Sequence, residues 1–99
     1  MDTAEVIEKL RRYKQLLRKQ IKFDQLILFG SYAKGTAHAD NDMDVAVIVD
    51  ELKLDYFITR PLLWKIRREI DDRIEPILLE KKSDDSGFIS EILEHGIII

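Results

Sequence analysis

Two aspartates separated by one residue suggest the chemistry of a metal-bound phosphate. Asp42 and Asp44 stand at the start of Met43–Val49, an apolar run typical of a buried strand. Because side chains alternate along a strand, both carboxylates are expected on one face, where they repel each other. A divalent cation relieves that repulsion, and Mg²⁺ is typically bound by one or two carboxylates together with phosphate oxygens. The pair therefore predicts a magnesium–phosphate site.

A glycine–serine pair upstream has the features of a phosphate-binding turn. Gly30 and Ser31 follow a second apolar run at 26–29, and we expect one helical turn from Ser31 to Lys34. Backbone N–H groups at the start of a helical turn attract phosphate, and Gly30 has no Cβ to obstruct its approach. The Ser31 hydroxyl can donate to the same phosphate, and Lys34 would add a point charge.

A third acid, Glu75, lies between apolar neighbours in a further strand expected at 73–79. A buried carboxylate without a partner is costly, and a metal shared with Asp42 and Asp44 would remove that cost. Three carboxylates and a phosphate-binding turn are the parts needed for in-line attack at a nucleotide α-phosphorus. In a two-metal site, one ion activates the attacking hydroxyl and the other stabilises the pyrophosphate that leaves.

Each of these features also has a purely structural interpretation. The two aspartates can cap a turn, and Gly30–Ser31 can be an ordinary strand-to-helix turn. Glu75 can form an ion pair, and Lys34 can be a solvated loop residue. The arginines available to Glu75 are Arg67, Arg68 and Arg73.

The aromatic and histidine residues give weaker signals. Tyr32 and Trp64 are expected to be packing residues, with a stacked adenine as the alternative. His38 and His95 have no partners at metal-ligand spacing and receive no role.

Composition excludes several classes of protein. The chain has 99 residues, enough for one domain, expected to span 1–99. It has no cysteine, which excludes disulfides, thiolate zinc sites and cysteine nucleophiles. The net charge of −3 argues against sequence-specific binding of nucleic acid. No leader-like or membrane-spanning run is present, so we expect a cytoplasmic protein without membrane contact.

The elements that must position these residues alternate between helical and extended patterns, which predicts a mixed α/β fold. Apolar spacing predicts helices at 3–20, 61–71 and Phe88–His95. Pro61 is expected to begin the second helix, with a separate turn before it. Strands are expected at 26–29, 43–49, 73–79 and 97–99. Pro76 cannot donate to a strand ladder, which favours an edge position for the third strand.

The pattern Gly30-Ser31, ten residues, then Asp42-Met43-Asp44 resembles the signature of the DNA polymerase β-like nucleotidyltransferase superfamily. The length and the stretch Gly-Ser-Tyr-Ala-Lys-Gly-Thr-Ala most resemble its minimal nucleotidyltransferases. The resemblance implies an α+β nucleotidyltransferase fold, a small mixed β-sheet with helices packed on it. It further implies that Gly30 and Ser31 bind the triphosphate and that Asp42 and Asp44 hold Mg²⁺. Glu75 matches the third acidic position, where aspartate is common.

The resemblance also implies a function. Minimal nucleotidyltransferases are commonly antitoxins paired with a HEPN-domain ribonuclease toxin, and the known acceptor is a toxin tyrosine. The expected activity is therefore Mg²⁺-dependent transfer of AMP from ATP to a hydroxyl of a partner, in a hetero-oligomer. Two alternatives are open: an antitoxin that acts by binding alone, and transfer to a small molecule such as an aminoglycoside.

Overall fold

The structure, a computed structural model, describes residues 2–36, 42–51, 56–84 and 86–99. His38 and most of the loop before Asp42 lie outside the described residues. The elements in chain order are α1 (Thr3–Arg18), β1 (Gln25–Phe29), α2 (Ser31–Lys34), β2 (Met43–Val49), α3 (Tyr56–Arg67), β3 (Ile74–Glu80), a 3-10 turn (Lys81–Ser83), α4 (Phe88–His95) and β4 (Ile97–Ile98).

The strands form one mixed sheet in the order β3-β2-β1-β4. β1 is antiparallel to both β2 and β4, whereas β2 and β3 are parallel. The predicted mixed sheet is confirmed, and β3 lies at its edge as Pro76 requires. The observed strand begins one residue later than predicted, at Ile74.

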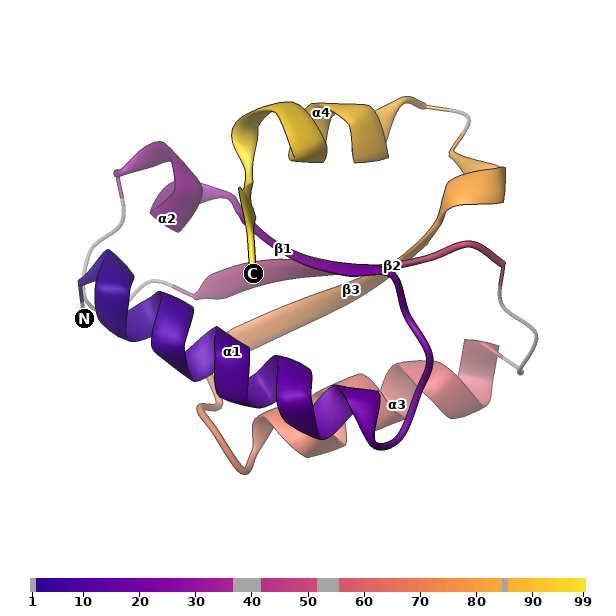
Figure 1. The fold of residues 1–99 in the computed structure, drawn as a ribbon, viewed down its shortest axis with the longest axis horizontal. Helices are drawn as coiled ribbons and strands as arrows, with labels where there is room; N and C mark the ends of the chain where they lie inside the picture. The colour runs from indigo at the N-terminus through magenta and orange to yellow at the C-terminus, as the bar shows by residue number, and fades with distance from the viewer. Residues whose placement is uncertain (1, 37–41, 52–55, 85) are drawn as a thin grey trace.

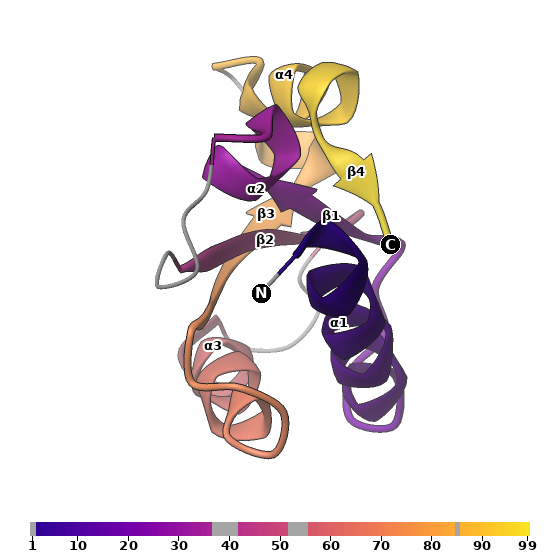
Figure 2. The same cartoon turned by 90° about the vertical axis from the view of Figure 1, so that its left-hand side faces the viewer.

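Helices cover both faces of the sheet. α1 and α3 pack on one face, and α2 and α4 lie on the other (Figures 1 and 2). Alternate residues of β2 separate accordingly: Val45 and Val47 join the larger core beneath α1 and α3, and Ala46 and Ile48 join a smaller core beneath α4. A side chain's parity on β2 or β3 therefore decides which helical layer it faces.

The first helix is held by a cap and by one long-range hydrogen bond. Asp2 is its N-cap, and its carboxylate accepts a hydrogen bond from the Glu5 N–H at 2.8 Å. The Tyr13 hydroxyl, fully buried, donates to the Leu63 carbonyl at 2.8 Å and so joins α1 to α3. The helix ends at Arg18, two residues earlier than predicted, and residues 19 and 20 form a turn.

The expectation that Pro61 begins the second helix is wrong. α3 is continuous from Tyr56 to Arg67, with Pro61 inside it. Proline removes one backbone donor from a helix. Pro61 lies only five residues after the start of α3, next to an exposed first turn, so the loss falls near the helix end and the helix tolerates the proline. The helix also ends four residues before the predicted boundary.

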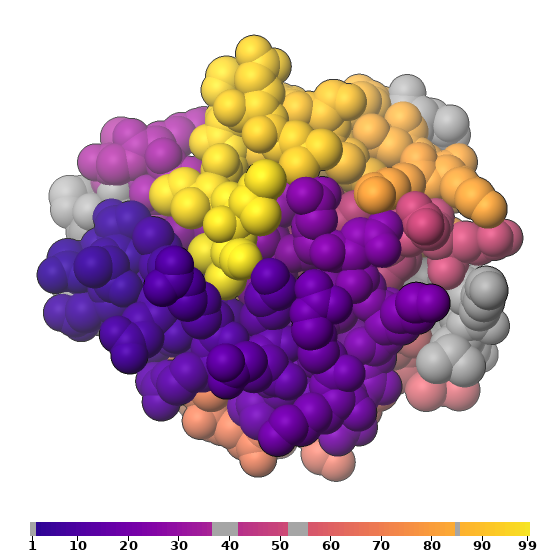
Figure 3. Space-filling model, in the orientation of Figure 1, coloured from indigo at the N-terminus to yellow at the C-terminus, as the bar shows by residue number. Residues whose placement is uncertain are grey.

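The C-terminal segment pairs with β1, the first strand in the chain. Gly96 caps α4 with extended backbone, and its N–H donates to the Ile92 carbonyl at 2.7 Å. Beyond β4, the Ile99 N–H donates to the Leu26 carbonyl, and Lys14 Nζ donates to the Ile99 carbonyl, both at 2.9 Å. In Figure 3 the yellow C-terminal segment packs against the indigo and purple N-terminal part. Among the residues described, no helix is long and apolar enough to cross a membrane.

One carboxylate, Asp71, ties α1 to the turn before β3, and we expect its loss to destabilise the fold. Its oxygens bind Lys9 Nζ and Arg73 Nη2, each at 2.8 Å, and its side chain is only 9% exposed. The Arg73 hydrogen bonds, followed by those of Lys9, hold the pKa of Asp71 far below its usual range. Asp71→Asn should lower the free energy of unfolding at pH 7 by about 1–3 kcal/mol.

The sign of the pH dependence follows from the lowered pKa. The contribution of Asp71 is present above the pKa of an unfolded aspartate, about 3.9, and is lost as the pH falls through the lower folded value. The difference between wild type and Asp71→Asn should therefore shrink below about pH 4. Urea unfolding across pH 2–7 measures it, with the exposed neighbour Asp72→Asn as control. A pH-independent difference would contradict the ion-pair assignment.

Candidate active site

Asp44 lies at the centre of the candidate site because of its place in the sheet. On one side it pairs with Phe29, the last residue of β1, and on the other it pairs with Glu75 of β3. In a parallel pair, residues in register present their side chains to the same face. Asp44 and Glu75 share the parity of Ala46 and of Ile77, so their face is the one that α4 covers.

Asp42 completes a group of three interacting carboxyl groups. Burial raises the pKa of Asp44 above its ordinary value, and the charge of Asp42 raises it further, while a hydrogen bond with Glu75 acts in the opposite direction. Burial also raises the pKa of Glu75, and the hydrogen bond to Asp42 and the charges of both aspartates add to the rise. The sequence-predicted acids are thus brought together, and their mutual charge disfavours the ionised forms of Asp44 and Glu75.

Two of the three arginines proposed as structural partners of Glu75 have other principal contacts. Arg73 binds Asp71, and Arg67 Nη1 donates to the backbone carbonyls of Asp72 and Ile74. The charge of Arg67 does lower the pKa of Glu75, but it is the smallest of the effects on that group. Repulsion from the neighbouring aspartates and burial outweigh it.

Gly30 joins the turn predicted to bind phosphate to this group of acids. Its backbone has φ +73° and ψ −148°, a conformation essentially restricted to glycine. A Cβ at this position would collide with Asp44 Oδ2 and lie 3.2 Å from its Cγ. Glycine is therefore required for two reasons, backbone conformation and the close approach of Asp44. The sequence suggested only space for phosphate, because the neighbour of Gly30 is set by strand pairing.

Ser31 begins α2 as predicted, and the helix is a single turn. Gly30 caps it without a side chain, and the Lys34 N–H donates to the Gly30 carbonyl at 3.1 Å. Tyr32 points into the main core and is 4% exposed, so the packing interpretation holds for it. Trp64 packs at the edge of the same core with Arg67 4.4 Å above its ring.

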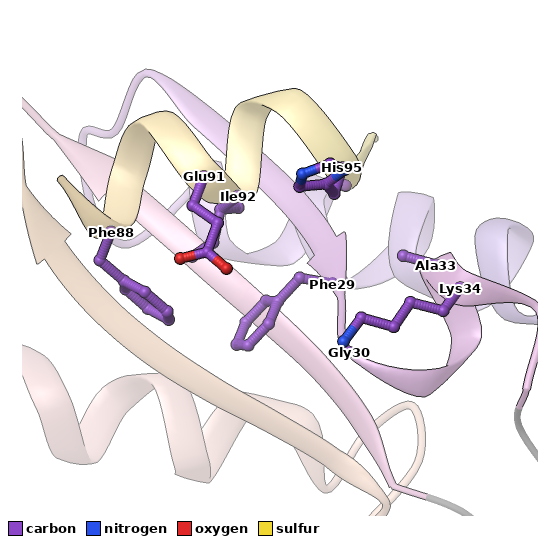
Figure 4. A pocket seen from close by; sticks show the side chains of 9 residues that line it. Phe29, Gly30, Ala33, Lys34, Phe88, Glu91, Ile92 and His95 are labelled. Carbon is purple, nitrogen blue, oxygen red and sulfur yellow. The ribbon is translucent and has the colours of Figure 1, made fainter.

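A pocket of about 170 Å³ opens beside Gly30 on the face that carries the acids. Phe29, Ile92 and Phe88 supply apolar walls, and Glu91, His95 and Lys34 supply polar groups. Figure 4 shows the Glu91 carboxylate pointing from α4 toward the Phe29 ring, and the Lys34 side chain extending toward Gly30. Sequence reasoning missed Phe88, Glu91 and His95, because α4 follows the Gly30 turn by more than fifty residues and carries no motif.

The donor set suits Mg²⁺ by its chemistry. Asp42, Asp44 and Glu75 offer only carboxylate oxygens, the ligands that a hard cation prefers, and a cation would relieve their mutual repulsion. Within the part of the chain described, no three acidic or histidine side chains are gathered into a ready-made metal site. The three carboxyl groups interact electrostatically, and phosphate oxygens would have to complete the coordination.

The fold and site point to the nucleotidyltransferase class, and comparison with known proteins agrees. Residues 11–99 match the family described as "Polymerase beta, Nucleotidyltransferase". The chain therefore belongs to this family and is a nucleotidyltransferase.

Individual relatives narrow the comparison. A protein of Methanocaldococcus jannaschii named "Putative protein adenylyltransferase MJ0141" is 33% identical over 98% of each chain. A Sulfolobus solfataricus structure titled as a putative nucleotidyltransferase superposes with a TM-score of 0.69 at 14% identity, covering 97% of this chain and 80% of that one; it supports the fold alone. A structure titled "Crystal structure of the toxin-antitoxin with AMP-PNP" superposes with a TM-score of 0.58 at 25% identity, over 99% and 72%.

Relief of repulsion between the acids gives a stability prediction. Asp44→Asn should raise the melting temperature of the metal-free protein by a few degrees, because the unfolded chain separates the acids and the cost exists only in the native state. Mg²⁺ with ATP should raise the wild-type melting temperature further, because ligand at 100 times Kd stabilises the folded form by about 2.7 kcal/mol, and the variant should lose most of that response.

Thermal scans of both proteins with and without Mg²⁺-ATP measure the two effects. A variant that melts earlier than wild type and still responds fully to Mg²⁺-ATP would contradict the repulsive cluster.

Proposed function

We propose that this protein is a Mg²⁺-dependent protein adenylyltransferase that transfers AMP from ATP to a tyrosine hydroxyl of a HEPN-domain toxin and thereby acts as its antitoxin. The observation that carries the proposal is the register of the sheet, which sets Asp44 between Glu75 and the Gly30 turn. The names of two relatives, a putative protein adenylyltransferase and a toxin–antitoxin complex with AMP-PNP, support ATP as the donor and a toxin as the partner.

In the proposed reaction, the triphosphate tail lies on the Gly30–Ser31 turn, where backbone N–H groups and the Ser31 hydroxyl donate to it. The α-phosphate then lies over Asp42 and Asp44. The acceptor oxygen forms a bond to the α-phosphorus, and the bond from that phosphorus to the oxygen bridging the β-phosphate breaks. Pyrophosphate leaves, and a carboxylate of the cluster takes the hydroxyl proton.

Asp42, Asp44 and Glu75 would hold Mg²⁺, which when bound stabilises the negative charge that develops on the phosphates and activates the hydroxyl. The protein's own contribution is to position three carboxylates at one sheet edge. In-line geometry separates the two ends of the reaction: the leaving pyrophosphate lies toward Gly30, and the attacking hydroxyl lies toward Glu75.

Transfer of AMP is tested with ATP labelled at either the α- or the γ-phosphate. Incubation with Mg²⁺ and the protein encoded by the neighbouring gene should label that partner from α-labelled ATP and leave it unlabelled from γ-labelled ATP. Label from the γ-phosphate would indicate a kinase. If both labels stay with the complex of the two proteins and denaturant then releases them, the nucleotide is bound without being transferred.

A further inference from the structure

The pocket between α2 and α4 lies directly beside the proposed phosphate site. Phe29 forms its floor and is also the strand partner of Asp44, while Gly30 and Lys34 line both the pocket and the phosphate turn. A single ligand whose phosphates lie on the turn can therefore extend a second group into the pocket. This inference rests on the proposed function, since it concerns the same nucleotide.

The size and walls of the pocket suit one planar ring system. Its volume, about 170 Å³, is below the usual 300–1,000 Å³ of sites that enclose whole ligands, and it is near that of a cavity that binds benzene. The rings of Phe29 and Phe88 meet edge to face with centroids 6.0 Å apart. Phe88 is 36% exposed, so part of its ring surface is available to a ligand. Aromatic side chains of this kind stack on nucleobases.

The polar groups at the rim suit a base that carries an amino group. A glutamate carboxylate only accepts hydrogen bonds, and a lysine ammonium only donates. The Glu91 carboxylate points into the pocket from α4, and Lys34 reaches toward it from α2 (Figure 4). Adenine presents an exocyclic amino donor beside a ring-nitrogen acceptor, which matches this pair. Guanine presents a carbonyl oxygen where adenine has its amino group, and a carboxylate repels it.

We propose that this pocket binds the nucleobase of the substrate nucleotide, and that Glu91 selects adenine by accepting a hydrogen bond from its exocyclic amino group. Glu91 is a specificity residue and takes no part in the bond exchange. The phenol ring of an acceptor tyrosine is the competing occupant. Its single hydroxyl both donates and accepts, so the binding measurements below, rather than the rim groups alone, distinguish it from the base.

The test compares equilibrium binding of three probes, measured by calorimetry with Mg²⁺ and no acceptor: ATP, purine riboside triphosphate, which lacks only the amino group, and inorganic tripolyphosphate. Wild type should bind ATP about tenfold or more tightly than purine riboside triphosphate, because hydrogen bonds to a charged group are strong. In Glu91→Met this ratio should fall to near one. Glu91→Gln keeps an acceptor oxygen and should retain part of the preference for ATP over purine riboside triphosphate.

Two controls separate the base from the phosphates. All of these variants should bind tripolyphosphate with equal affinity. Phe88→Ala should weaken the binding of ATP about tenfold and leave the binding of tripolyphosphate unchanged. Glu8→Gln, the same substitution on an exposed face of α1, should behave as wild type. Thermal melting of each variant establishes that it is folded.

Three outcomes are distinguishable. Failure of wild type to bind both ATP and tripolyphosphate would overturn the proposed function itself. Normal ATP binding with an unchanged base preference in Glu91→Met would overturn only this inference. Unchanged nucleotide binding together with a raised KM for the acceptor protein would assign the pocket to the acceptor and would equally overturn it.

Discussion

Replacing either Asp42 or Asp44 by asparagine is expected to abolish nucleotide transfer while the protein remains folded. Each substitution removes a negative oxygen where phosphate charge is handled, and loss of one such electrostatic contact typically costs about 10²–10³-fold in rate. Asp42 is exposed and Asp44 is half-buried beside Gly30, so neither is needed to fill the core. Steady-state transfer to the partner, with circular dichroism to verify folding, measures the effect.

The matched control is Asp50→Asn. Asp50 follows the other end of β2, its side chain is 71% exposed, and its ion pair with Lys81 spans 3.7 Å. Exposed ion pairs contribute little, so this variant should retain wild-type activity. Equal losses of activity in the variants of Asp42, Asp44 and Asp50 would show that the net charge of the protein governs the reaction, and not the position of the acids beside Glu75.

Gly30→Ala is expected to eliminate transfer and to destabilise the fold. Its backbone conformation is unfavourable for any residue with a Cβ, at a cost of about 1–3 kcal/mol. The added methyl group also collides with Asp44 Oδ2, so the carboxylate must move. For a chain of this size each kcal/mol corresponds to roughly 4–8 °C in melting temperature.

Gly35→Ala provides the comparison for this second effect. Gly35 also has positive φ, +72°, but a Cβ there meets nothing within 4 Å. That variant should be destabilised by about 1–2 kcal/mol and keep its activity. If Gly35→Ala loses activity as completely as Gly30→Ala, general strain in the loop, rather than displacement of Asp44, accounts for the loss.

Much of the fold could be predicted from local pattern. The apolar runs at β1 and β2 predicted buried strands, and Pro76 placed β3 at the edge before any pairing was known. The error at Pro61 arose because proline is common at the first position of a helix. Here Pro61 lies in the second turn of α3, where the exposed first turn before it makes the proline tolerable.

The candidate site could be predicted only in part. The short spacing from Gly30 to Asp44 made those residues visible as one motif, and alternation placed the two aspartates together. Two features depend on long-range geometry: the contact that excludes a Cβ at Gly30, and the pocket wall formed by Phe88 and Glu91. No local pattern encodes which helix covers a sheet face, so α4 could not be assigned to the site from sequence.

The most direct test of the central claim is the intact mass of the proposed HEPN-domain partner. After incubation with wild-type protein, ATP and Mg²⁺, its mass should increase by whole AMP units that map to a tyrosine, and its ribonuclease activity should fall. With Asp44→Asn the mass should not change. A partner that is silenced equally by wild type and Asp44→Asn, with no change in mass, would contradict the account and indicate an antitoxin that acts by binding alone.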